Sequence, residues 1–323
     1  MSTAVLAELL TTAQRYAPEY RGGLSTHLPM ALGALQALGA DDDRLRQAFD
    51  RFAAPLGLAP RTGQVVADWT DHRGRPGAYA DLLETFRRQI DAEGAGTVLR
   101  RVLPLLMPGV GAAAFHGLIR SAYGVAAQHD GETAAGLAYW ACRWLPLEAP
   151  SQGVETDPGA WVSAMADALA GTAFEGGLIF ERMRAIGRTE AFARHAGRLI
   201  IDAGTLQALA DLAAQRYAAS RNFTVLHLVT SCHALRLLLP HVDDAEVAVR
   251  HYALAYAAGC VASGIDLKAP PLPTPGLTWA QVVQSAVASN DEHVIKLVHS
   301  CRDEAALYGD GARLHAAALV VGT

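Results

Sequence analysis

The sequence predicts an all-α fold, a bundle of about a dozen helices around a central cavity, and three observations support this. Apolar residues recur at spacings of three and four, the period of a helix that buries one face. Strict apolar–polar alternation, which half-buried strands require, is nearly absent. Apolar residues make up 51% of the 323 residues and charged residues 18%, so the chain can build a large core.

Start and stop signals divide the first half of the chain. Leucines keep a helical period through residues 24–38, where Thr26 is the expected N-cap and Pro29 falls in the first turn. Gly39 closes that helix. Glycine and proline signals predict a loop at 60–77. Further helices are expected at 42–52, 79–90, 97–107, 112–127 and 131–145.

The second half begins after a polar, proline-containing stretch at 146–158, the one candidate internal division of a single helical domain spanning 1–323. Asp157 and Pro158 match the N-cap and first position of a new helix, and Asn290 is the expected N-cap of the last. Prolines favour an extended path at 264–277. The remaining helices are expected at 189–202, 205–219, 222–239, 243–262, 278–288 and 290–307.

Charge and motifs exclude several function classes. The net charge of -5 and a pI of about 6.2 argue against a nucleic-acid partner. The four cysteines form no CxxC pair, the N-terminus lacks a basic leader region, and no apolar run of about 18 residues is apparent. We therefore expect a cytoplasmic protein without a membrane span. Neither a dinucleotide fingerprint, a P-loop nor a GxSxG elbow occurs in context.

Histidines carry the chemical signal. Of the twelve, His72, His129 and His241 lie in polar turns and are expected to be solvated. Any one histidine in an apolar helix is usually a hydrogen-bonded core residue. Burying a set of them without partners would cost several kcal/mol, whereas a shared metal ion would satisfy them all. Five lie in apolar helical segments: His27, His116, His227, His233 and His293.

Spacing restricts how these residues can meet. His227 and His233 are six residues apart, about 240° around a helix, so at most one can join a common site. His293 and Lys296 are three apart and share a helix face. Lys296 is one of only two lysines, the other being Lys268. Taken alone, it would be expected to extend its amine to solvent.

Five blocks of sequence together resemble the questin oxidase-like family over residues 20–305. This family includes fungal Baeyer–Villiger-type oxidases of anthraquinone and aflatoxin pathways. The blocks are THLPMALGALQALGA (26–40), FHGLIRSAYG (115–124), GLAYWACRW (136–144), LHLVTSCHALR (226–236) and DEHVIKLV (291–298).

The resemblance implies an oxygen-using enzyme that acts on polycyclic aromatic polyketides with a non-haem iron. It further implies that Lys296 is N-carboxylated and ligates the iron, which burial permits because it makes the neutral amine available. His233 would support a ligand or take the place of His227. The remaining ligands would be His27, His116, His227 and His293.

Other roles stay open at this stage. Arg120, one turn after His116, could steady an anionic substrate oxygen or form a salt bridge inside the bundle. Tyr123 could donate a proton or simply pack. NADPH could serve as an external reductant beside dioxygen, and the oligomeric state is open. Two other functions compete with the oxidoreductase: a metal-dependent hydrolase, and a non-enzymatic helical binder of an apolar ligand.

Overall fold

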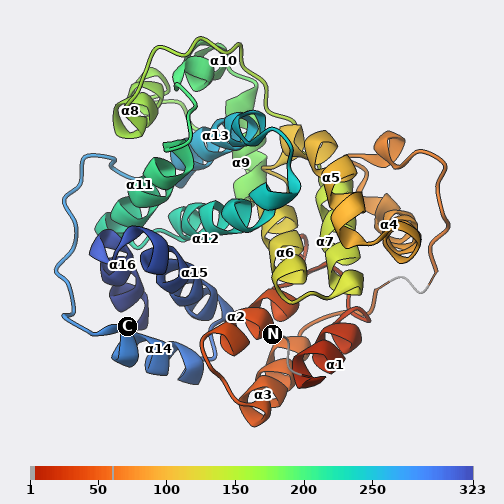
Figure 1. Ribbon diagram of the computed structural model, residues 1–323. Coiled ribbons are helices and arrows are strands. Elements are labelled where there is room, and N and C mark those ends of the chain that lie inside the picture. The colour runs from red at the N-terminus through yellow and green to blue at the C-terminus, as the bar shows by residue number, and fades with distance from the viewer. Residues whose placement is uncertain (1–3, 60–61, 323) are drawn as a thin grey trace.

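The computed structural model describes residues 4–59 and 62–322, and it is all-α as predicted (Figure 1). Sixteen α-helices occur in this part of the chain, more than the expected dozen. They are α1 (Ala4–Ala13), α2 (Leu28–Ala37), α3 (Asp42–Ala53), α4 (Tyr79–Glu93), α5 (Ala95–Leu106), α6 (His116–Ala126), α7 (Asp130–Cys142), α8 (Pro158–Ala168), α9 (Ile179–Gly187), α10 (Glu190–His195), α11 (Thr205–Ser220), α12 (Phe223–Leu238), α13 (Ala245–Ser263), α14 (Trp279–Ala288), α15 (Glu292–Tyr308) and α16 (Gly311–Val321).

Short elements connect these helices. Strands β1 (Glu19–Tyr20) and β2 (Leu24–Ser25) pair antiparallel just before α2. The 3-10 helices are η1 (Trp69–His72), η2 (Pro76–Ala78), η3 (Met107–Gly109), η4 (Ala196–Arg198) and η5 (Leu239–His241). The first two lie within the segment predicted to be a loop, of which residues 60–61 fall outside the described residues.

Several predicted boundaries are wrong for local reasons. Thr26 does not cap α2, because its hydroxyl donates to the carbonyl of Ala17, and His27 occupies the N-cap. Asp291 rather than Asn290 caps α15, its carboxylate accepting from the backbone N–H of His293. The helix expected at 189–202 is shorter, since α10 ends at His195 and only η4 follows. Helices α1, α9 and α16 are short and were not predicted.

The start of α6 matters most for the site. A helix was expected from residue 112, but Ala113, Ala114 and Phe115 have φ values of 46°, 55° and 69°. Non-glycine residues rarely adopt this left-handed conformation, and three in a row prevent a helix. α6 therefore begins at His116, and the preceding turn leaves the Ala113 carbonyl beside the imidazole.

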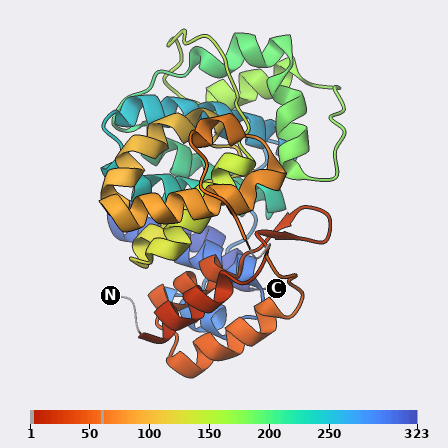
Figure 2. The ribbon, with the colours of Figure 1, turned by 90° about the vertical axis from the view of Figure 1, so that its right-hand side faces the viewer.

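Helix α12 lies at the centre of the molecule, between α6, α11, α13 and α15 (Figure 1). α2 closes the group by packing on both α6 and α15. Figure 2 shows the N-terminal helices gathered at one end and the α8–α10 region at the other. The four helices α2, α6, α12 and α15 thus surround one interior region.

The central helix also qualifies the expectation that no apolar run has the length of a membrane span. Among the described residues, Phe223–His241 is the one helical stretch with the length and mean hydropathy, 1.3, of such a span. Within the protein 72% of that stretch is buried, as in the core helix of a bundle.

Helices α6 and α7 are in backbone contact, because glycines line their interface. A Cβ on Gly117 would lie 2.5 Å from Trp140 Cα, and one on Gly124 would lie 2.6 Å from Thr133 N. A Cβ on Gly136 would lie 2.5 Å from Ser121 N. Any larger residue would separate the two helices and displace the first turn of α6.

We expect Gly124→Ala to lower the free energy of unfolding by about 1–3 kcal/mol, because the added methyl group overpacks the interface. Gly96→Ala is the matched control, since a Cβ there meets nothing within 4 Å, and it should change stability by less than about 1 kcal/mol. Urea unfolding followed by circular dichroism measures both. Equal effects would contradict the close packing of α6 on α7.

Candidate metal centre

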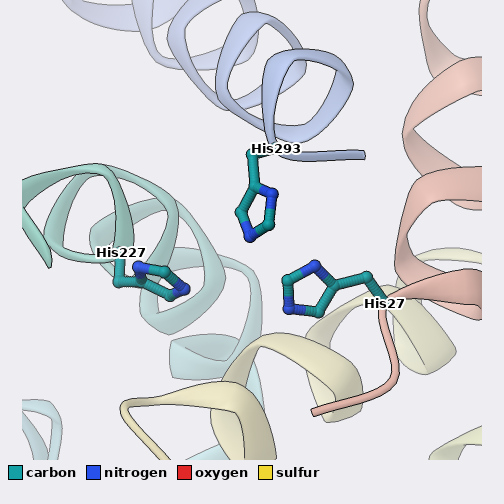
Figure 3. A group of neighbouring side chains, drawn as sticks. All are labelled: His27, His227 and His293. Carbon is teal, nitrogen blue, oxygen red and sulfur yellow. The ribbon is translucent and has the colours of Figure 1, made fainter. Parts of the chain in front are cut away.

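Four histidines meet where α2, α6, α12 and α15 surround the interior. His27 is the N-cap of α2, and His116 is the first residue of α6. His227 is the fifth residue of α12, and His293 is the second of α15. One nitrogen each of His27, His227 and His293 lies within 4.8 Å of the others (Figure 3). The Nε2 of His116 lies 2.7 Å from that of His27.

Backbone carbonyls orient two of these rings. The Nδ1 of His116 lies 2.5 Å from the carbonyl oxygen of Ala113, and that of His227 lies 2.8 Å from the carbonyl oxygen of Phe223. A carbonyl can only accept, so Nδ1 carries the proton in both rings. The Nε2 of each ring then carries a free electron pair, the arrangement typical of metal-binding histidines.

Carboxylates stand beside the other two rings. The Nδ1 of His293 lies 3.3 Å from Asp291 Oδ1. The Nδ1 of His27 lies 3.3 Å from Glu292 Oε1, close enough for an ion pair but outside hydrogen-bond geometry. The Nε2 of His293 is buried without a hydrogen-bond partner. All four rings therefore have a polar group behind Nδ1.

His27 and His116 contact each other directly through their Nε2 atoms. In the metal-free protein, neutral His27 can donate from Nε2 to the Nε2 electron pair of His116, because no hydrogen bond fixes a proton on His27 Nδ1. The charged imidazolium form is disfavoured, because burial, with Lys296 adding to it, lowers the pKa of His116 to about 3. Burial, and after it the charge of Lys296, also hold the pKa of His27 well below its usual value. The donor set and its electrostatics therefore fit a metal cation.

Lys296 lies one turn after His293. Its side chain is 1% exposed and its Nζ has no hydrogen-bond partner. Burial lowers the pKa of Lys296 to about 8, against the opposing effect of Glu292. Burial likewise raises the pKa of Glu292, against the effect of Lys296. The neutral amine is consequently accessible near neutral pH.

Two cavities border the cluster. One, of about 420 Å³, is lined by His27, His116, His227 and His293 together with mainly apolar residues, among them Leu178, Ile179, Phe180 and Phe223. The other, of about 710 Å³, reaches His27 and Glu292 and is more polar, with Gln47, Asp50 and Arg51 in its wall. Tyr20 and His27 line both.

Comparison with known families identifies the chain. The sequence profile of the Questin oxidase-like family matches residues 24–301, which include all four histidines and Lys296. The chain belongs to the questin oxidase-like family. Membership indicates an oxidoreductase that acts on a small aromatic polyketide molecule. No curated protein matches the chain.

In this questin oxidase-like protein, Arg120 lies away from the cluster. Its guanidinium pairs with Glu132 of α7, with Nε 2.5 Å from Oε1 and both side chains almost fully buried. The salt bridge, one of the two roles that the sequence left open, is what the structure contains. Arg120 is not among the residues lining either cavity at the histidines.

Tyr123 and His233 lie about two helical turns from the cluster. The Tyr123 hydroxyl is hydrogen-bonded to His299 Nδ1 at 2.8 Å. His233 Nε2 is hydrogen-bonded to Asp303 Oδ2, also at 2.8 Å. The structure thus brings His227, and not His233, to the meeting point, as expected for residues about 120° apart around α12.

Sequence reasoning missed three residues around these groups. Glu292 directly precedes His293 and is four residues before Lys296, so it shares their helix face. His299 continues the three-residue spacing of His293 and Lys296. Tyr20 carries no signal, because only the β1–β2 hairpin places it between the two cavities.

We expect the metal-free protein to lose stability as the pH falls below about 6.5. The buried histidines have folded-state pKa values below those of the unfolded chain, so the unfolded chain binds more protons. The stability that these rings contribute is complete above pH 6.5. It falls by about 1 kcal/mol per pH unit for each ring as the pH approaches the folded-state pKa values.

Urea unfolding between pH 7.5 and pH 5.5 measures this slope. His116→Gln should reduce it by about one proton, because one buried imidazole is removed. A slope unaffected by that substitution would show that His116 is freely protonated in the folded protein.

Proposed function

We propose that the protein is an oxygen-dependent oxidoreductase with a non-haem Fe(II) held by His27, His116, His227 and His293. The observation that carries the proposal is the orientation of four imidazoles, each with a polar group behind Nδ1, around one point. Neutral imidazole with an oxygen ligand suits ferrous iron. The reaction we propose uses dioxygen to cleave, or insert oxygen into, a ring C–C bond.

We further propose that Lys296 supplies the oxygen ligand as a carbamate. Its neutral amine would attack carbon dioxide, forming an N–C bond and releasing one proton. The Lys296 Nζ has no hydrogen-bond partner as an amine, whereas the carbamate would ligate the iron. The pKa of about 8 supports this step, since an ammonium group cannot react.

The apolar cavity supports a planar aromatic substrate of the quinol type. Phe223 packs edge-on against both His227 and His293, with ring centroids 4.8 Å and 4.7 Å away, and is itself 54% exposed. Its ring therefore offers a stacking surface next to the proposed iron. Arg182, which also lines the cavity, could pair with a phenolate oxygen.

Two further features belong to this proposal. Reducing equivalents, where the reaction needs them, would come from NADPH acting as an external donor. We place the enzyme in the cytoplasm, since Cys142, Cys232, Cys260 and Cys301 are all free and buried thiols.

A metal-dependent hydrolase is the second candidate, and Glu292 is the observation that favours it. Carboxylated-lysine hydrolases need a carboxylate base beside the metal, and Glu292 lies 3.3 Å from His27. Such an enzyme would hold zinc rather than iron. The identity of the bound metal therefore separates the two functions.

We expect the protein purified without chelators or a His-tag to contain near-stoichiometric iron, and Lys296→Ala to lose most of it. Removal of one ligand should weaken metal affinity by roughly 10-fold or more. Lys268→Ala is the matched control, because it removes the only other lysine, in an exposed loop. Elemental analysis measures the metal, and labelling with ¹³C-bicarbonate followed by NMR detects the carbamate.

The other outcomes are equally informative. Zinc in place of iron would favour the hydrolase. No metal in the folded parent protein would exclude the proposed centre and favour a binder of apolar ligands.

We expect Phe223→Ala to weaken binding of a hydroxylated anthraquinone by roughly tenfold, the effect of losing one aromatic stacking partner. Leu307→Ala is the control, because Leu307 is a similarly exposed apolar residue outside both cavities. Fluorescence titration measures the dissociation constants. Equal constants for the two variants would place the aromatic ligand outside the cavity.

A further inference from the structure

A second polar layer lies beneath the histidine cluster, on three of the same helices. Tyr123 follows His116 by seven residues on α6, and His233 follows His227 by six on α12. His299 follows His293 by six on α15. These spacings correspond to a separation of roughly 10 Å along the helices. The three rings of this layer are in mutual contact, with centroids 5.0 to 6.5 Å apart.

The centre of this layer is a hydrogen-bonded pair. The Tyr123 hydroxyl and His299 Nδ1 are 2.8 Å apart, and Tyr123 is 5% exposed. Burial, with a contribution from His233, lowers the pKa of His299 to about 3, so the imidazole is neutral and can accept. Burial also raises the pKa of Tyr123, so the phenol is protonated and donates.

A carboxylate stands behind the pair. Asp303 accepts hydrogen bonds from His233 and from Arg236. Its charge acts on His299 against the effect of burial and favours a proton on that ring. His233, Arg302 and Arg236 act in the opposite direction, so His299 takes up a proton only from a strong acid such as an oxidised phenol.

The pair also borders a space of its own. A cavity of about 230 Å³ is lined by Tyr123, His299 and Gln36, and it reaches the surface at the exposed residues Ala37 and Ala126. The cavity at the histidine cluster lies elsewhere and contains neither ring of the pair. Tyr123 thus lies between a surface opening and the cluster.

We propose that Tyr123 is a redox-active tyrosine that exchanges one electron with the histidine cluster, with His299 as its proton acceptor. One electron leaves the phenol for an oxidising equivalent at the cluster. The O–H bond breaks and an N–H bond forms at His299 Nδ1. When the electron returns from the cluster, the N–H bond at His299 breaks and the O–H bond of the phenol re-forms.

The pairing with a base distinguishes Tyr123. Among the described residues, no other tyrosine hydroxyl is hydrogen-bonded to an imidazole. Tyr256 is equally buried but donates to the backbone carbonyl of Leu209, which cannot take up a proton. A separation of two helical turns is within the range over which electrons tunnel through proteins. The exchange with the cluster rests on the proposed function, whereas the oxidation of Tyr123 does not.

The test uses electron paramagnetic resonance on freeze-quenched samples. Metal-free protein oxidised with hexachloroiridate(IV) should give a tyrosyl radical, identified by labelling with ring-deuterated tyrosine. Tyr123→Phe should abolish it, and Tyr256→Phe should leave it unchanged. His299→Gly should lower the yield by roughly tenfold or more, and imidazole entering the vacated space should restore it.

A radical that persists in folded Tyr123→Phe, at Tyr20 or Tyr139 for instance, would overturn the proposal, as would the absence of any radical. A second sample, the iron-loaded protein exposed to dioxygen without substrate, should give the same signal. A radical with hexachloroiridate but not with iron and dioxygen would overturn the exchange with the cluster. If the protein holds no iron, the proposed function fails while the first sample still tests Tyr123.

Discussion

The main constraint on the structure is the burial of four imidazoles at one place, between α2, α6, α12 and α15. The Nε2 atoms of His27 and His116 lie 2.7 Å apart, so one neutral ring donates to the other unless a cation replaces the proton between them. Burial of such groups costs several kcal/mol, so packing elsewhere must hold the helices in place. The glycine contacts of α6 on α7 and the buried pair of Arg120 and Glu132 provide that support. Arg120 thus serves the site by fixing the helix that carries His116.

The surroundings of the cluster differ from one side to the other. An apolar cavity with Phe223 in its wall lies on one side, and a polar one bordered by Glu292 lies on another. Tyr123 and its imidazole partner lie two turns below, next to a third cavity. An aromatic molecule, small polar reactants and electrons would therefore reach the same centre by separate routes. One ring of helices can provide this separation because three of its helices, α6, α12 and α15, carry polar residues at two levels.

The sequence was informative where a feature depends on local spacing. Helical periodicity predicts the fold class, and the three-residue spacing of His293 and Lys296 places both on one face of α15. It could not show that His116 starts its helix, because the three left-handed residues before it are alanines and a phenylalanine, which give no turn signal. The choice between His227 and His233 also needed the neighbouring helices. Likewise, the sequence left two roles open for Arg120, and only the contact with Glu132 of α7 selects the salt bridge.

Charge balance links the proposed iron to the proposed carbamate. With Lys296 as an ammonium group, a divalent ion would bring the buried charge to three positive units, which Glu292 alone could not offset. With Lys296 as a carbamate, the carbamate and Glu292 together neutralise the ion. Metal binding and reaction with carbon dioxide therefore favour each other, and thermodynamic linkage requires that each raise the affinity for the other by the same factor. The lowered pKa of Lys296 is the feature of the metal-free protein that makes this coupling accessible near neutral pH.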